Sequence, residues 1–152
     1  MTADILSDLI VPPVQLATLG YLGVTTGWIY ISNDLTFQLN DLIKDGIAKY
    51  VATCWETGRS GRQYLIAFII FKSVHSENAL KTRYGFSAGV LLAKHSKKVT
   101  PCLVVRWMQG NYYTSGFLKP RNETFQEVRC PNYKMLGREK DKAFLSALWE
   151  GS

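Results

Sequence analysis

Apolar and polar positions along the chain form short blocks that are separated by glycines, prolines and polar turns. The aromatic and β-branched run at residues 27–32 predicts a strand, and leucines at helical spacing in residues 35–43 predict a helix that ends at Gly46. Residues 47–56 and 64–71 are two further apolar runs, joined by a polar stretch that contains two glycines. This combination predicts a β-hairpin.

The pattern continues with two capped helices and two more strands. Ser76 predicts the cap of a helix that ends at Gly85, and residues 88–95 predict a strand. Thr100 followed by proline marks the start of another helix, and the aromatic run at residues 111–117 suits a strand or a strand edge. The blocks therefore alternate between strands and helices over most of the chain.

The two ends of the chain have weaker patterns. Pro120 and Pro131 bracket a predicted loop, and residues 138–149 predict a basic amphipathic helix. Residues 1–25 are expected to form an N-terminal arm, extended or as a short helix on the domain, and residues 26–152 a single domain. The order of elements predicts an α+β fold, an antiparallel sheet flanked by helices that bury one apolar face and leave the other face available.

Charge and cysteine content narrow the class of protein. The formal net charge of +6 favours contact with nucleic acid or another anionic surface. The three cysteines are odd in number and lack metal-type spacing, which argues against a disulfide framework and a zinc site and favours a reducing, intracellular compartment. The longest apolar runs are far shorter than the roughly 20 residues of a membrane helix, so we expect a soluble protein without a membrane partner.

Several short motifs follow one another in a fixed order. They are Trp-Ile-Tyr-Ile-Ser-Asn at residues 28–33, Glu-Thr-Gly-Arg-Ser-Gly at 56–61, Tyr-Leu-Ile-Ala-Phe at 64–68, Phe-Lys at 71–72, Leu-Lys at 80–81 and Tyr-Thr-Ser-Gly at 113–116. In this order they resemble the N-terminal HUH endonuclease domain of Rep proteins from circular single-stranded DNA viruses. The resemblance covers about residues 26–120 and implies the antiparallel sheet of that fold.

The same resemblance implies a chemistry that this chain has partly lost. In the family a pair of histidines and an acidic residue hold Mg²⁺ or Mn²⁺, and a tyrosine attacks the scissile phosphate with help from a lysine. The resemblance places Glu56 at the acidic position and Tyr113 at the nucleophile, but Tyr64 and Ile66 replace the histidines and Gly116 replaces the lysine. A single carboxylate is a poor site for a catalytic cation. We therefore expect a binding domain without a cofactor, and an active Mg²⁺- or Mn²⁺-dependent nicking endonuclease is the alternative.

What remains after the loss of catalysis is the means to bind single-stranded DNA or RNA. Aromatic rings on a sheet stack on bases, and basic side chains neutralise phosphates. The candidate nucleic-acid contacts are Arg59, Arg62, Tyr64, Lys94, Lys97, Lys98 and Tyr112. Residues 94–98 form the only compact basic cluster, just before a predicted helix start. A viral origin would place the protein in the cytoplasm or nucleus of a host cell.

Two other classes of protein compete with this interpretation. Residues 67–71 match the end of the RNA-recognition-motif signature, but residues 64–66 do not match its start. A protein-interaction domain, binding a partner or a second copy of the chain, would use one of the tryptophans Trp28, Trp55, Trp107 and Trp149 as an interface anchor. Core positions are expected for at least Trp28 and Trp107.

Overall fold

The computed structural model describes residues 2–10, 12–34, 39–95, 99–110, 113–114, 117–118 and 122–135. In chain order its elements are α1 (Thr2–Asp8), the 3-10 helix η1 (Pro13–Gln15), β1 (Ala17–Leu19), β2 (Thr25–Ser32), α2 (Asn40–Lys44), β3 (Ala48–Thr57), β4 (Gln63–His75), α3 (Glu77–Tyr84), β5 (Gly89–Lys94), α4 (Pro101–Met108), β6 (Tyr113–Thr114), β7 (Phe117–Leu118) and β8 (Gln126–Arg129).

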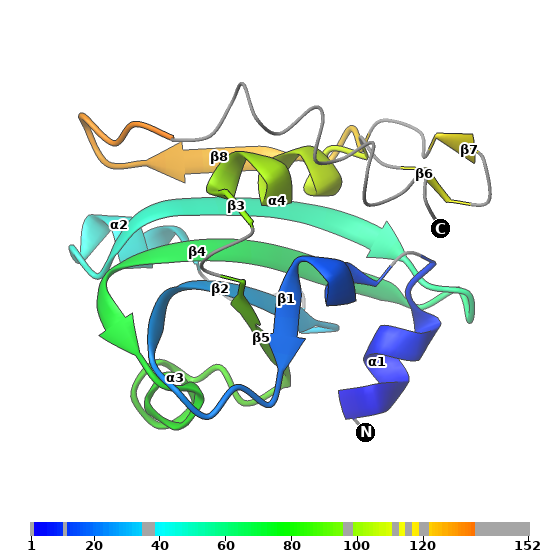
Figure 1. Cartoon of the computed structure of the whole chain (residues 1–152), viewed down its shortest axis with the longest axis horizontal. Helices are drawn as coiled ribbons and strands as arrows, with labels where there is room; N and C mark the ends of the chain where they lie inside the picture. Colours follow the sequence, from blue (N-terminus) through cyan, green and yellow to red (C-terminus); the bar gives the residue numbers. More distant parts are fainter. Residues whose placement is uncertain are drawn as a thin grey trace.

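An antiparallel sheet of six strands forms the centre of the molecule (Figure 1). Its strand order is β1-β5-β2-β4-β3-β8, and β6 and β7 form a separate two-stranded sheet. The elements β2-α2-β3-β4-α3-β5 constitute a βαββαβ unit, whose strands occupy the four central positions. The predicted α+β fold with an antiparallel sheet and flanking helices is thus confirmed.

Local sequence signals account for most of these boundaries. The Ser76 hydroxyl accepts a hydrogen bond of 3.1 Å from the Ala79 amide, and the Thr100 hydroxyl accepts one of 3.2 Å from the Leu103 amide. Gly85 ends α3 with a φ of +77°, a conformation that favours glycine. The hairpin of β3 and β4 is confirmed, and β4 continues beyond the predicted end to His75.

Both faces of the sheet are buried, so the prediction that one face stays available was wrong. On one face α2 and α3 contribute Leu42 and Leu80 to a core with the inward residues of β2, β4 and β5. On the other face α4 contributes Leu103 and Trp107 to a second core, and Leu9 packs there from the segment after α1. The continuous apolar run of β4 is typical of a strand buried on both sides, and alternation would have indicated an open face.

Each end of the described chain contains one strand that was not expected from the sequence. The N-terminal segment contains the short helix α1, one of the two expected alternatives, and also β1, which pairs with β5 at one edge of the sheet. The region between Pro120 and Pro131 contains β8, which pairs with β3 at the other edge and was expected to be a loop. All four residues of β8 are exposed, so the strand carries no buried apolar face that a sequence pattern could reveal. The predicted helix at residues 138–149 lies outside the described residues.

Candidate nucleic-acid interface

The hairpin turn is held by the end of α1. Asp8 accepts hydrogen bonds from the Ser60 amide at 2.8 Å, the Ser60 hydroxyl at 2.6 Å and the Tyr64 hydroxyl at 2.7 Å. The hydrogen bonds from Ser60, followed by the one from Tyr64, hold the pKa of Asp8 below its ordinary value. A Cβ atom at Gly58 would lie 2.2 Å from the Asp8 carboxylate, so the close approach requires glycine at this position.

Of the three hairpin residues that were predicted to contact nucleic acid, two are exposed and one is buried. Arg59 and Arg62 are exposed at the turn and accessible to a phosphate. Tyr64 is only 1% exposed, and its hydroxyl is engaged by Asp8. In this structure the Tyr64 ring is a core residue and is not accessible to a base.

The predicted basic cluster at residues 94–98 is described only in part. The Lys94 ammonium donates a hydrogen bond of 2.8 Å to the Val99 carbonyl, and its half-buried side chain packs over Gly27. Burial lowers the pKa of Lys94. Lys94 therefore stabilises the connection between β5 and α4, whereas Lys97 and Lys98 lie outside the described residues.

The residues of the predicted catalytic site lie in β3, β4 and β6. Glu56 is half-buried near the end of β3, directly across the pairing from Tyr64, and burial raises its pKa to about 7. Among the described residues no group of three histidine, cysteine, aspartate or glutamate side chains is placed to hold a metal ion. Tyr113 is in β6, paired with Leu118, and Tyr112 lies outside the described residues. The metal and nucleophile assignments therefore stay predictions.

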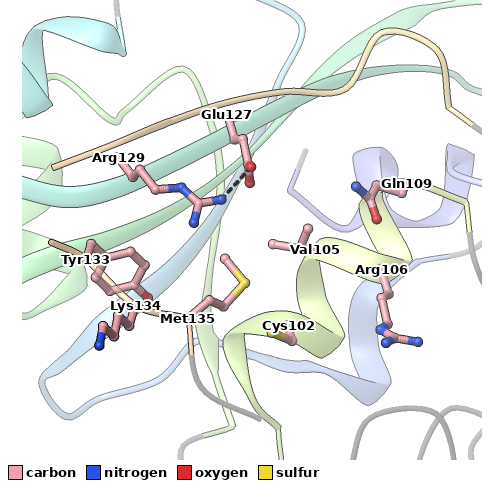
Figure 2. Close-up of a pocket in the computed structure, with 9 residues that line it drawn as sticks. All are labelled: Cys102, Val105, Arg106, Gln109, Glu127, Arg129, Tyr133, Lys134 and Met135. Carbon is pink, nitrogen blue, oxygen red and sulfur yellow. Dashed lines mark hydrogen bonds and ion pairs between the residues drawn. The ribbon is translucent and has the colours of Figure 1, made fainter. Parts of the chain in front are cut away.

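A cavity lies between α4 and β8, at a place that the sequence did not indicate. This α4–β8 pocket has a volume of about 540 Å³, within the range of ligand sites. It is lined by Cys102, Val105, Arg106, Gln109, Glu127, Arg129, Tyr133, Lys134 and Met135 (Figure 2). Three of these side chains are cations and one is a carboxylate, so the pocket is positively charged.

The charged side chains are spread along the pocket. Figure 2 shows Arg106 on α4 at one side of the pocket, and Arg129 on β8 together with Lys134 at the opposite side. The half-buried ring of Tyr133 lies beside Arg129 and Lys134. Glu127 is engaged by its neighbours, because it accepts hydrogen bonds from the Tyr50 hydroxyl and from Arg129. The pocket thus has cations on two opposite sides and an aromatic ring beside two of them.

Sequence reasoning missed these residues because they come from separate segments. Arg106 lies in the last turn of a helix whose other residues are mostly buried, and no motif marks it. Arg129 and Lys134 line the same pocket because β8 pairs with β3. The pairing of an exposed edge strand was the missing step, and no motif signals it.

Comparisons with known proteins do not assign the chain to a family. No family model matches the sequence, and a search of curated proteins finds no significant match.

In the described part of the chain, no helix has the length and apolar character needed to cross a membrane. Trp28 and Trp107 are buried in the two cores, as expected, and Trp55 is half-buried.

Proposed function

We propose that this protein binds single-stranded nucleic acid in the α4–β8 pocket. The observation that carries the proposal is that three basic side chains, Arg106, Arg129 and Lys134, line one open cavity from its two sides. Proteins that bind single strands combine a positively charged groove with aromatic rings on which bases stack. The net charge of +6 adds a long-range attraction for any polyanion.

A single strand fits this pocket better than a duplex does. The cavity is about 540 Å³ and has Tyr133 at its wall, so it suits a flexible strand whose bases are unpaired. Stacking of a base on an aromatic ring contributes about 1–3 kcal/mol. The exposed Arg59 and Arg62 at the hairpin turn supply further phosphate contacts outside the pocket.

The proposal includes descent from a Rep-type endonuclease that has exchanged catalysis for binding. The βαββαβ order supports this relation, although the same strand order occurs in RNA-recognition motifs. The sheet face that carries Tyr64 and Ile66 is buried under α4, which disfavours base stacking on the sheet itself. Binding beside the sheet, between α4 and β8, is the mode that this covered face supports.

The salt dependence of binding tests the proposal. The three pocket cations alone predict that log K falls against log salt concentration with a slope of about −2, and phosphate contacts by Arg59 and Arg62 would make the slope steeper. Fluorescence anisotropy of labelled single-stranded DNA and RNA measures this slope. Three single variants replace Arg106, Arg129 or Lys134 by glutamine. Each variant should have a lower affinity and a slope that is smaller in magnitude by about 0.7.

A matched control and a parallel sample complete the experiment. Arg83→Gln removes an exposed cation from α3, which packs on the other sheet face, and should leave affinity and slope nearly unchanged. Failure of the wild-type protein to bind, or equal effects of all four variants, would refute the pocket as the site.

A parallel sample with Mn²⁺ on a denaturing gel tests the nicking alternative, because an active enzyme would leave a covalent DNA adduct on Tyr113.

A further inference from the structure

The α4–β8 pocket holds one carboxylate among its cations, and we propose that this group, Glu127, is a positioning residue for Arg129. In this role the carboxylate strengthens the binding of an anion by fixing the guanidinium that contacts it. The inference rests on the proposed function and adds the way in which the site is organised. It explains why a site for a polyanion retains a negative charge.

Two contacts hold the Arg129 side chain, one with Glu127 and one with the Tyr50 ring. Tyr50 and Arg129 face each other across the pairing of β3 and β8, and Glu127 lies two residues away on the same face. Arg129 Nη2 donates a hydrogen bond to Glu127 Oε1, and the Tyr50 hydroxyl donates one to Glu127 Oε2. The Arg129 guanidinium carbon lies 5.6 Å from the centroid of the Tyr50 ring, within the range of a cation–π contact.

Tyr50 connects this arrangement to the core. Its side chain is fully buried, with the Phe68 ring at 6.2 Å and the Tyr133 ring at 5.5 Å between centroids. A buried tyrosine held on both sides has a fixed hydroxyl, so Glu127 receives its hydrogen bond from a rigid donor. A guanidinium has five N–H donors in a planar fork, and Glu127 engages it at Nη2 while further donors remain for a phosphate.

Positioning and repulsion predict opposite effects for the same substitution. A carboxylate close to a bound phosphate repels it, so repulsion alone predicts that neutralising Glu127 strengthens binding. If Glu127 fixes Arg129, neutralising it releases the guanidinium and weakens binding. The direction of the change therefore decides between the two roles.

The experiment compares Glu127→Gln, Tyr50→Phe and Glu123→Gln for binding of a labelled single-stranded oligonucleotide. We expect Glu127→Gln to weaken binding by about fivefold, as for the loss of one charge-assisted contact. Tyr50→Phe leaves the charge unchanged but removes the hydrogen bond to Glu127, and we expect it to weaken binding by about threefold. Glu123→Gln removes the same charge from an exposed residue outside the pocket and should leave binding unchanged or slightly stronger. Tighter binding by Glu127→Gln would overturn the inference.

A second measurement keeps the inference separate from the proposed function and from folding defects. The Nε–Hε signal of Arg129 in an NMR spectrum, assigned with an Arg129→Lys variant, reports whether the guanidinium is fixed. In the free protein this signal should be dispersed, and it should move to the position of solvated arginines in Glu127→Gln and Tyr50→Phe while the backbone spectrum stays native. If the wild-type protein binds no oligonucleotide, the proposed function fails. The arginine signal then decides the inference alone, and an unchanged signal in both variants would refute it.

Discussion

The half-buried carboxyl group of Glu56 makes the stability of the protein dependent on pH in a defined direction. Burial raises its pKa from the ordinary value of 4.5 to about 7. Between these two values the folded protein holds a proton that the unfolded chain has released. The free energy of unfolding therefore falls as the pH rises through this window, and the penalty is complete above about pH 7.

The size of this penalty follows from the difference between the two pKa values. At about 1.36 kcal/mol for each pKa unit, the change from 4.5 to about 7 corresponds to about 3 kcal/mol. Glu56 is partly exposed, and solvent screening reduces such a contribution, so we expect about 1–2 kcal/mol. Glu56→Gln removes the ionisable group and should make the protein more stable at pH 8 by this amount. At pH 4 the two proteins should unfold with nearly equal free energies.

Urea unfolding followed by tryptophan fluorescence measures these free energies at both pH values. The chain contains four tryptophans, of which Trp28 and Trp107 are buried in the two cores, so the transition reports on both faces of the sheet. Glu123→Gln is the matched control, since it removes an exposed carboxylate. A Glu56→Gln protein that is no more stable than wild type at pH 8, or that gains equally at pH 4, would refute the burial of this group as the cause.

Three further substitutions test the packing that positions the site. Trp107→Ala removes a ring that is 2% exposed and should lower the free energy of unfolding by about 3–5 kcal/mol, a loss visible in urea unfolding. Thr100→Ala removes the hydroxyl that accepts a hydrogen bond from the Leu103 amide and should cost about 1 kcal/mol, while Thr100→Ser should restore most of it. Tyr64→Phe removes the hydrogen bond to Asp8 and should lower the thermal midpoint without changing oligonucleotide affinity. A large loss of affinity in Tyr64→Phe would show that this residue contacts the ligand after all.

Elements whose cause lies within a few residues were predictable from the sequence. The caps at Ser76 and Thr100, the glycine that ends α3 and the hairpin at residues 57–62 each follow from local chemistry. The βαββαβ order also follows from the blocks of apolar residues. Such signals act over one turn of helix or one strand, so they can be recognised in the sequence without knowledge of the fold.

Features that depend on distant partners were not predictable in this way. The continuous apolar run of β4 indicates a strand buried on both sides, but the elements that cover each face are seen only from the placement of α2, α3 and α4. The strand β8 has four exposed residues and is fixed by its register with β3, from Tyr50 opposite Arg129 to Thr53 opposite Gln126. The candidate site could not be predicted for the same reason, because Arg129 belongs to β8.

The attachment of the N-terminal segment at two distant places has a consequence for the order of events during synthesis. Asp8 binds the hairpin turn around Ser60, and β1 pairs with β5 as far as Lys94. During synthesis Asp8 and β1 thus lack these partners until the hairpin and β5 have been made. Closing such long loops costs chain entropy before any contact repays it. The N-terminal segment is therefore expected to dock only after the hairpin and β5 have formed.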